Sequence, residues 1–241
     1  MVTTIGSSSF SMASISIIIP VLNEEAYIEK LLRTILKHST SNQIKEILVV
    51  DGGSTDNTLS IAKKFGVKTI SCPSGRAKQM NIGTQKATGE ILYFLHVDSL
   101  PPLGFDQKIV QSYNEGYKTG CFRLKFDTQS YFLGFFAWFT KINQPICRGG
   151  DQSLFITKEL FKKLKGFNEE FVIYEDNEFI RRIYKVTSFK VIDDFIETST
   201  RRYKKHGNVR LQYHFAMIHL KYYLGSGPQT LFNYYKKHIA L

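Results

Sequence analysis

Hydrophobic residues between Ile15 and Asp98 form short β-branched runs that alternate with stretches of helical spacing. This alternation is typical of parallel strands joined by right-handed crossover helices, and it predicts an α/β fold for the first half of the chain. We expect strands at 15–20, 46–51, 67–71 and 91–95, and helices from about 24, after 56 and at about 76–87. Asn23 is placed to cap the first of these helices and Asp56 the second. Pro20 ends the first strand because proline cannot donate to the ladder.

Beyond residue 102 the alternation becomes irregular, which indicates an α+β half packed against the first. The spacing predicts a helix near 105–116, a strand near 120–127, an aromatic helix near 130–142 and an amphipathic helix over 208–224. No change of composition marks a linker, so we expect a single domain over 14–241 with two functional halves, 14–100 and 101–241. The polar residues 1–13 are expected to form a disordered leader.

The composition is that of a folded globular protein, since 43% of the 241 residues are hydrophobic and 22% are charged. Three cysteines without a CxxC pair argue against a disulfide framework and a Cys-rich zinc site, and they favour a reducing compartment. No stretch approaches the run of about 18 apolar residues that a membrane span needs. The N-terminus also lacks the basic and apolar regions of a signal peptide, so we expect a cytoplasmic protein.

The formal net charge of +11 favours an anionic partner. A nucleotide diphosphate, a nucleic acid and an acidic lipid surface all fit, and charge alone does not choose among them. The chain contains neither the P-loop motif of ATPases nor a GxGxxG motif after a strand. The absence of both motifs therefore argues against an ATPase and against a dinucleotide-dependent oxidoreductase.

Carboxylates stand where two of the predicted strands end. Asp51 closes the strand at 46–51, and Asp98 follows the strand at 91–95. Open α/β sheets bind their ligands at this carboxyl edge, so we expect the two side chains to face a ligand. Further acidic residues occur in the segments GGDQ (149–152) and YED (174–176). Transfer of a group from a nucleotide diphosphate needs a divalent cation, a carboxylate that holds it and a separate carboxylate as base, and the chain offers all three.

Four motifs in order resemble the signature of a family 2 glycosyltransferase with the GT-A fold: IIIPVLNEE (17–25), VVDGGSTDNT (49–58), HVD (96–98) and YED (174–176). The linking segments GRAKQMNIG (75–83), GGDQSLFI (149–156) and STRRYKKHG (199–207) are similar to one compact, soluble bacterial subfamily. The resemblance covers nearly the whole chain. It implies an α/β fold with a mostly parallel central sheet flanked by helices, a nucleotide-sugar-binding half at 14–100 and an acceptor half with C-terminal helices at 101–241.

The resemblance implies roles for five residues on the donor side. Pro20 and Glu24 lie where the family's first loop contacts the nucleoside, and Asp51 lies where a carboxylate accepts from the uracil or ribose. Arg76 would pair with the diphosphate because a guanidinium matches phosphate geometry, and Asn81 would face the same cleft. Local sequence leaves alternatives open, namely a turn-forming role for Asp51 before the following glycine and a solvated helix start for Arg76.

Four further residues belong to the donor and acceptor sides by the same resemblance. Segment 199–207 stands where related enzymes carry a QxxRW-like sequence, with Tyr203 in place of tryptophan. The tyrosine ring can stack on a sugar, and Arg201 or Arg202 can clamp the diphosphate. Asp151 follows two glycines that let the backbone approach a ligand closely, which places it on the acceptor side.

Asp98 matches the last acidic residue of the family's DXD metal motif, and His96 occupies the motif's first position. The resemblance therefore implies Mg²⁺ or Mn²⁺ held by Asp98. Manganese is favoured if His96 also touches the ion, because imidazole binds transition metals better than magnesium. The alternative for His96 is that it closes the strand and bonds to the backbone.

Glu175 and Asp176 resemble the ED motif in which the aspartate is the general base. Asp176 would take the proton from the acceptor hydroxyl as that oxygen attacks the anomeric carbon, with inversion at this carbon. The same pair suits the first turn of a helix at 177–184, where negative charge is favourable. The role as catalytic base and the role at the helix start are compatible.

These features predict an inverting glycosyltransferase with a nucleotide-diphosphate sugar as donor, UDP-linked for preference, and a hydroxyl acceptor. The alternatives are a nucleotidyltransferase of related architecture, a basic nucleic-acid-binding protein without catalysis, and a retaining transferase on the same fold. A transferase of this kind needs no nucleic acid as a partner. The aromatic segment 131–139 and the basic C-terminal helix also allow peripheral contact with anionic lipid at the inner face of the membrane, where a lipid-linked acceptor would be found.

Overall fold

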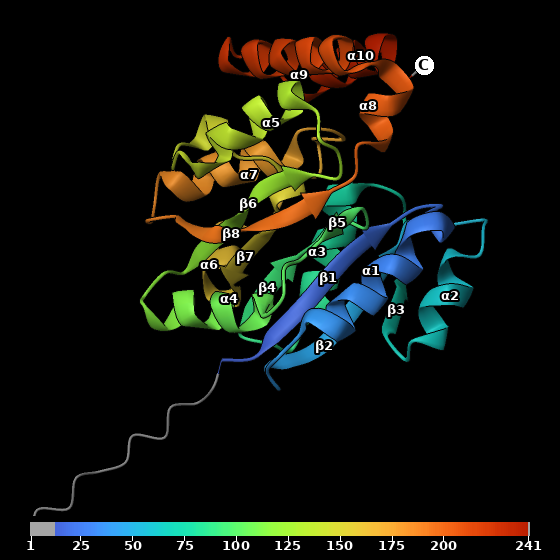
Figure 1. The fold of residues 1–241 in the computed structure, drawn as a ribbon, viewed down its shortest axis with the longest axis vertical. Helices are drawn as coiled ribbons and strands as arrows, with labels where there is room; N and C mark the ends of the chain where they lie inside the picture. Colours follow the sequence, from blue (N-terminus) through green and yellow to red (C-terminus); the bar gives the residue numbers. More distant parts are fainter. Residues whose placement is uncertain (1–12, 241) are drawn as a thin grey trace, which may run out of the picture.

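The computed structural model describes residues 13–240, and these form one eight-stranded sheet flanked by helices (Figure 1). The strand order across the sheet is β3-β2-β1-β4-β7-β6-β8-β5. The strands are β1 (Ile15–Val21), β2 (Ile44–Asp51), β3 (Lys68–Ser71), β4 (Ile91–Phe94), β5 (Ser99–Leu100), β6 (Thr119–Phe126), β7 (Leu154–Thr157) and β8 (Lys190–Thr198). Neighbours from β3 to β4 are parallel, as are β6 and β8, whereas β7 and β5 run antiparallel to their partners. The predicted α/β class with a mostly parallel sheet is confirmed.

Helices cover both faces of this sheet. They are α1 (Glu25–His38), α2 (Thr58–Lys64), α3 (Arg76–Lys86), α4 (Phe105–Asn114), α5 (Tyr131–Trp138), α6 (Lys158–Lys163), α7 (Glu175–Tyr184), α8 (Arg201–His206), α9 (Asn208–Tyr223) and α10 (Pro228–His238). Single 3₁₀ turns follow α5 at Phe139–Lys141 and precede β7 at Pro145–Cys147 and Gly150–Gln152. None of the helices between residues 13 and 240 combines the length and the apolar character needed to cross a bilayer.

Two hydrophobic cores form because β1 is buried on both faces. Ile17 and Ile19 pack with α1 and α4 on one side of the sheet, while Ile18 packs with α3 and α7 on the other. Successive strand residues point to opposite faces, so a continuous run of isoleucines is what a strand covered on both faces requires. Strand β1 ends at the edge of the sheet where the candidate site residues lie.

A third cluster of apolar residues joins α9 and α10 to the loop before α7. Leu211 and Ile218 of α9 and Leu231 of α10 are buried against Phe171 in this cluster. Figure 1 shows α9 and α10 at the end of the long axis farthest from α2 and α4, with α8 descending from them toward the sheet. The C-terminal helices, α8 to α10, therefore form a layer of their own that the chain enters directly from β8.

Several predicted boundaries differ from the structure. The first strand runs one residue past Pro20 to Val21, and the aromatic helix is shorter than expected because it passes into the 3₁₀ turn at Phe139–Lys141. The prediction that Asn23 caps α1 is wrong: Glu24 is the N-cap, and the Asn23 side chain accepts a hydrogen bond from the Thr55 amide instead. The predicted leader, 1–13, lies outside the described residues except for Ala13, which is buried.

Asp56 serves the helix that it was expected to cap and a second one as well. One carboxylate oxygen accepts from the amide of Thr58, the first residue of α2. The other oxygen accepts from the amide of Glu25, the first residue of α1. Helix starts leave amides without intrahelical partners, so one carboxylate satisfies donors of two helices at once and joins the loops that lead out of β1 and β2.

Candidate active site

A polar pocket of about 120 Å³ opens at the carboxyl ends of β1, β4 and β8. Nine of the residues proposed from the sequence line it: Pro20, Glu24, Arg76, His96, Asp98, Asp151, Arg201, Arg202 and Tyr203. They come from both halves of the chain, and β8 leads into the segment that brings the last three to the first half. Strand β8 carries no strong alternation in the sequence, so the meeting of these segments was visible only through the family resemblance.

Arg201 is the residue that joins the two halves of the pocket. Its guanidinium donates two hydrogen bonds to the carboxylate of Glu24, at 2.6 and 2.8 Å, and its Nε lies 3.0 Å from Oδ2 of Asp98. The same group stacks over the ring of Tyr27, with 4.3 Å between the guanidinium carbon and the ring centroid. Burial alone would lower the pKa of Arg201, but the neighbouring carboxylates of Glu24 and Asp98 raise it. The arginine is therefore a permanent positive charge between the carboxylates of Glu24 and Asp98.

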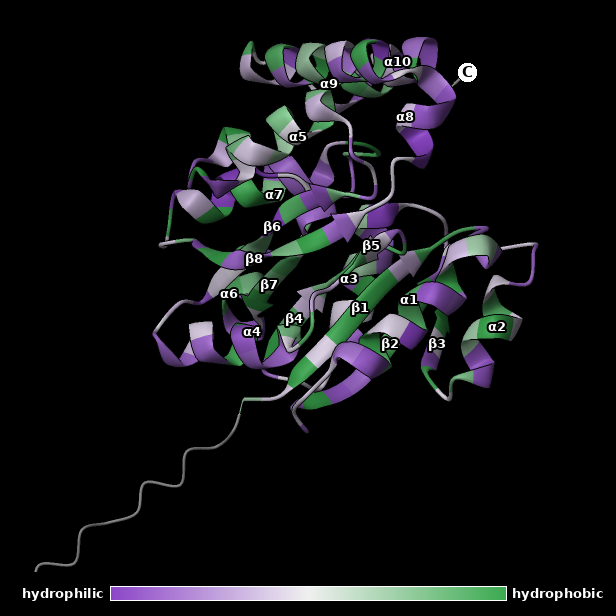
Figure 2. Cartoon of the chain, viewed as in Figure 1, coloured by the Kyte–Doolittle hydropathy of each residue, from purple (hydrophilic) through white to green (hydrophobic). Residues whose placement is uncertain are grey.

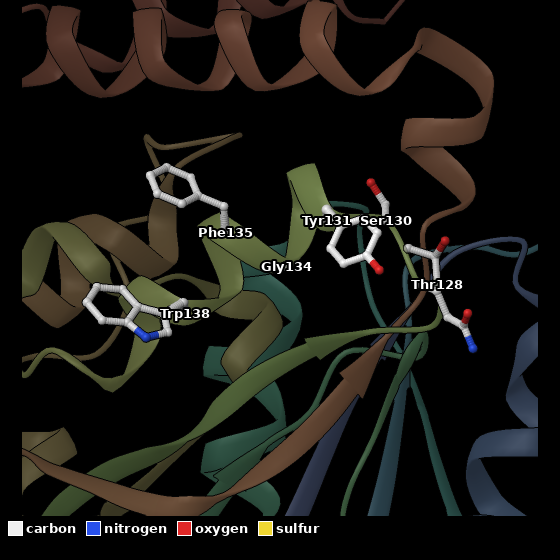
Figure 3. Close-up of a pocket in the computed structure, with 7 residues that line it drawn as sticks. Thr128, Ser130, Tyr131, Gly134, Phe135 and Trp138 are labelled. Atoms are coloured by element: carbon white, nitrogen blue, oxygen red, sulfur yellow. The ribbon is translucent and has the colours of Figure 1, made fainter.

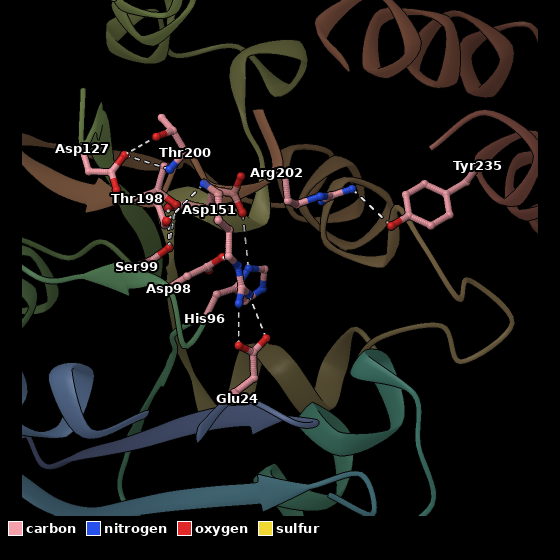
Figure 4. Close-up of polar contacts among 12 residues, drawn as sticks. Glu24, His96, Asp98, Ser99, Asp127, Asp151, Thr198, Thr200, Arg202 and Tyr235 are labelled. Atoms are coloured by element: carbon pink, nitrogen blue, oxygen red, sulfur yellow. Dashed lines mark hydrogen bonds and ion pairs between the residues drawn. The ribbon is translucent and has the colours of Figure 1, made fainter. Parts of the chain in front are cut away.

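His96 lies between two carboxylates, with one ring nitrogen toward each. Figure 4 shows the one from Asp151. Its Nδ1 is 3.5 Å from Oδ1 of Asp151, and its Nε2 is 3.4 Å from Oδ2 of Asp176. Burial lowers the pKa of His96, but the two carboxylates outweigh it and raise the pKa to about 10. An imidazole that donates from both nitrogens has no free lone pair for a metal ion. In this arrangement His96 bridges the carboxylates of Asp151 and Asp176.

Asp176 is held in place by His96 and by the close approach of a glycine. Burial would raise the pKa of Asp176, yet the hydrogen bond and positive charge of His96 lower it. A Cβ atom at Gly150 would collide with the Asp176 carboxylate and with the His96 ring. Only glycine leaves room at this position for the buried carboxylate, which explains one of the two glycines before Asp151.

Arg76 at the start of α3 pairs with Glu175, whose side chain is completely buried. Burial and the neighbouring Asp176 raise the pKa of Glu175, although Arg76 pulls it down. The second oxygen of Glu175, Oε2, has no hydrogen-bond partner. Because Arg76 also lines the pocket, it connects the ED pair to this cavity.

Two of the proposed donor residues do not line the pocket. Asp51 is buried and accepts from the amides of Gly53 and Ser54, which is the turn-forming role left open by the sequence. Asn81 does not face the cleft: its amide bonds to the backbone of Phe167 and to Glu169, because one turn along α3 the helix surface faces the loop before α7.

No sequence pattern indicates the contact that anchors the segment carrying Arg201. Asp127, just after β6, accepts from both the amide and the hydroxyl of Thr200, at 2.8 and 2.6 Å. Arg202 points the other way and donates to the hydroxyl of Tyr235 in α10 (Figure 4). Asp127 and Tyr235 are 73 and 33 residues from their partners. Such distant pairings carry no local pattern by which they could be found.

The donor groups of the pocket fit a divalent cation of the magnesium type. Among residues 13–240 no three histidine, cysteine or acidic side chains gather in a way that could hold a metal by themselves. Mg²⁺ in nucleotide sites is usually bound by one or two carboxylates together with substrate phosphates, and not by a complete protein cage. Asp98, a partly buried carboxylate on the pocket wall, is the residue that matches this requirement.

A second hollow, of about 590 Å³, lies along α5 and the loop before it (Figure 3). Aromatic side chains dominate it: Tyr131 and Phe135 are 96 and 59% exposed, and Trp138 is half exposed. Its wall begins at Thr128, directly after the Asp127 carboxylate that holds Thr200. The segment between β6 and α5 therefore borders this aromatic hollow and also holds Thr200, next to the polar pocket.

Comparison with known proteins agrees with this architecture. The family model described as glycosyl transferase family 2 matches residues 16–172. Glycosyltransferase AglE of Haloferax volcanii is 34% identical over 94 residues, a match that covers 36% of this chain and only 31% of AglE. The structure of S. aureus TarS 1-349 with UDP has a TM-score of 0.66 at 21% identity, covering 82% of this chain and 64% of that one. Mannosyltransferase PcManGT from Pyrobaculum calidifontis, solved with GDP-Man and Mn²⁺, gives 0.67 at 18%, covering 94 and 70%. At these identities the structural likeness shows a shared fold.

Proposed function

Because this chain belongs to glycosyl transferase family 2 and has the GT-A fold, we propose that it transfers a sugar from a nucleotide-diphosphate donor to an acceptor hydroxyl with inversion. One observation carries the proposal: Glu24, Arg76, Asp98 and Arg201 meet in a single pocket although they come from distant segments. A carboxylate for a cation beside guanidinium groups for a diphosphate is the donor set that such a leaving group needs. Family membership also favours a transferase over the nucleotidyltransferase and nucleic-acid-binding alternatives.

The donor half, 14–100, binds the nucleotide. Pro20 and Glu24 contact the nucleoside at the pocket wall, and Asp51 acts from beneath by fixing the loop after β2 or by accepting from the base or ribose. UDP is the preferred nucleotide because TarS, which shares the fold, has been solved with UDP and with UDP-GlcNAc. Donor binding requires Arg201 to exchange its bonds with Glu24 or Asp98 for bonds with the incoming diphosphate.

The diphosphate leaves with its charge held by cationic groups of this chain. Asp98 would hold Mg²⁺ or Mn²⁺, which neutralises developing negative charge on the phosphate oxygens when bound. PcManGT of the same fold has been solved with Mn²⁺. Arg76, Arg201 and Arg202 line the same cavity and supply fixed positive charge to the leaving group.

Asp176 is the base of the proposed reaction. The acceptor oxygen attacks the anomeric carbon, the bond from that carbon to the phosphate oxygen breaks, and the hydroxyl proton passes to the carboxylate of Asp176. Attack from the side opposite the leaving diphosphate inverts the configuration. His96 keeps Asp176 ionised by lowering its pKa, so the carboxylate is ready to accept a proton at neutral pH.

The acceptor half, 101–241, supplies Asp151 and Tyr203 to the same pocket. Asp151 is 59% exposed, so one oxygen remains available to a sugar or alcohol hydroxyl while the other faces His96. The Tyr203 ring, packed edge-on against Phe126, offers a surface on which a sugar can stack. We place the enzyme in the cytoplasm, in peripheral contact with the inner face of the membrane, where it would meet a lipid-linked acceptor.

The experiment that tests this function is hydrolysis and transfer with a panel of UDP-, GDP- and dTDP-sugars, with and without Mn²⁺. Asp176→Asn should lower turnover of the accepted donor about 100-fold or more while its binding persists, because a positioned base contributes that much. NMR of the product should show an anomeric configuration opposite to that of the donor. Retention of configuration, or an Asp176→Asn enzyme as fast as wild type, would contradict the assignment.

A further inference from the structure

The positive charge of this protein is concentrated at its C-terminal end. Residues 198–241 contain eight lysines and arginines and no aspartate or glutamate, whereas the whole chain carries +11. Two of the eight, Arg201 and Arg202, line the polar pocket, and the guanidinium of Arg202 donates to the Tyr235 hydroxyl. Lys204, Lys205 and Arg210 are exposed, and so are Lys236 and Lys237 at the end of α10. The outer surface of the C-terminal helices is therefore cationic without compensating acids.

Helix α9 carries apolar residues on two opposite sides. The stripe that packs inward against the third cluster consists of Leu211, Phe215, Ile218 and Tyr222. The second stripe is exposed and consists of Val209, Tyr213, Ala216, Leu220 and Tyr223. At 3.6 residues per turn these two stripes lie about 150° apart around the helix axis. Burial in the fold explains the inward stripe only.

The outward stripe is too apolar for an ordinary solvent-facing helix surface. Val209 is 68% exposed, Tyr213 59% and Leu220 50%, and Leu224 just beyond the helix is 76% exposed. The spacing of four and three residues repeats along the whole helix, so the stripe is continuous and not a scatter of single apolar residues. Arg210 and Lys221 both lie on one flank of this stripe, about 110° around the helix from its centre.

Helix α5 adds an exposed aromatic surface at the same end of the molecule. Figure 2 shows hydrophobic turns of α5 and α9 close to the end of the long axis that α10 caps. Of the eight residues of α5 only Leu133 is buried. Lys141 lies over the ring of Trp138, with 3.9 Å between its Nζ and the ring centroid. From Thr128 to Gly150 the chain contains no acidic residue. Aromatic rings bordered by lysine suit a membrane interface, where one end of each side chain is apolar and the other is wet.

We propose that the protein docks on an anionic lipid bilayer through the outward stripe of α9, with the aromatic surface of α5 as a second contact. Basic residues around an exposed apolar stripe match the headgroups and the acyl boundary together. A second copy of the chain fits less well because it would bring two uncompensated cationic surfaces together. Nucleic acid matches the charge but offers nothing to Val209 or Leu220.

Docking places the catalytic pocket beside the bilayer. Arg201 begins α8 and contacts Glu24, while Arg202 bonds to Tyr235 of α10, so the C-terminal helices are tied directly to the pocket wall. An acceptor that carries its hydroxyl on a lipid anchor would reach this pocket from the membrane side. The lipid-anchored acceptor rests on the proposed function, whereas docking itself does not.

The test is co-sedimentation of the full chain with vesicles of phosphatidylcholine, with and without phosphatidylglycerol, at low and high salt. Wild type should bind the anionic vesicles and be released by salt. The double variant Tyr213→Ser, Leu220→Ser should bind about ten-fold or more weakly, since each apolar side chain loses its burial. Lys236→Gln with Lys237→Gln should weaken binding about five-fold for each charge removed.

Matched variants on another face control for general effects. Leu36 is 58% exposed on α1, and Lys63 and Lys64 are exposed on α2. Leu36→Ser and the pair Lys63→Gln, Lys64→Gln should bind vesicles as wild type does. All exchanged side chains in both sets are exposed, so circular dichroism and donor binding should stay unchanged.

Three outcomes would overturn the proposal. One is failure of wild type to sediment with anionic vesicles at low salt, and a second is equal loss of binding in the α9 and α1 variants. The third is a concentration-dependent dimer that the Tyr213→Ser, Leu220→Ser variant abolishes while vesicle binding is absent, which would make a second copy the occupant. Donor binding measured on the same preparations separates a failure of docking from a failure of the proposed function.

Discussion

Replacing Arg76 tests whether the ED pair is held by charge. The Arg76 guanidinium contacts Glu175, whose side chain is completely buried, and Oε2 of Glu175 has no other partner. Arg76→Met keeps the aliphatic stem and removes the charge. The carboxylate of Glu175 is then left buried without compensation, and nothing else in the described contacts can take over.

The size of the effect follows from burial. Removing one partner of a buried ion pair costs about 3–5 kcal/mol, but the Arg76 side chain is 40% exposed and solvent screens part of the interaction. We therefore expect Arg76→Met to lower the free energy of unfolding by about 2–4 kcal/mol near neutral pH. The pKa of Glu175 is already raised in the wild type, first by its burial. A raised folded-state pKa means that stability is present at low pH and is lost as the pH rises through that pKa, so the deficit of the variant should shrink in acid.

The assay is urea unfolding followed by circular dichroism at several pH values. Arg33→Met is the matched control because Arg33 pairs with Glu29 on the surface of α1, with the two side chains 69 and 51% exposed. A surface pair of this kind contributes about 0–1 kcal/mol. If Arg76→Met costs no more than Arg33→Met at neutral pH, or if its deficit does not depend on pH, the pairing does not hold the ED motif.

Two further predictions concern the packing of the site and a buried carboxylate of the sheet. Gly150→Ala should destabilise the fold by about 1–3 kcal/mol and reduce turnover, because its Cβ would collide with Asp176 and His96. Gly149→Ala should be neutral since nothing lies within 4 Å of a Cβ there. Thermal unfolding compares the two variants. Burial would raise the pKa of Glu46, but hydrogen bonds to its carboxylate lower it to about 2. A lowered pKa gives stability that is present above the unfolded-state pKa and lost as the pH falls toward 2, so Glu46→Gln should cost about 3 kcal/mol near neutrality and progressively less in urea unfolding below about pH 5.

The parallel half of the fold could be predicted from local sequence because its signals are local. The isoleucine run of β1 and the spacing of Ile28, Leu31 and Ile35 in α1 identify their elements directly, and the structure buries these residues as expected. Strands β7 and β8 were missed because β8 mixes buried, half-buried and exposed positions irregularly and β7 has only four residues. Their place is fixed by pairing with distant strands, which local periodicity does not encode.

The site could be predicted residue by residue only where a motif carried it. The resemblance placed Glu24, Asp98 and Arg201 on one site, and the structure brings them within direct contact. The resemblance did not indicate that Arg201 contacts the carboxylates of Glu24 and Asp98 at the same time. His96 was considered as a metal ligand because of its place in the motif, but its bonding is decided by Asp151, which lies far along the chain. Side-chain partners across the fold are set by topology, so a motif names the residues and leaves their pairing open.

Binding of a UDP-sugar in the presence and absence of Mn²⁺, measured by calorimetry, tests the central claim most directly. The compared proteins are wild type, Asp98→Asn and Asp193→Asn, the last a control whose carboxylate is 86% exposed and outside the polar pocket. The account predicts metal-dependent binding in wild type and in Asp193→Asn, with loss of the metal dependence in Asp98→Asn. Nucleotide-sugar binding that is unaffected by Mn²⁺ and by Asp98→Asn would contradict it.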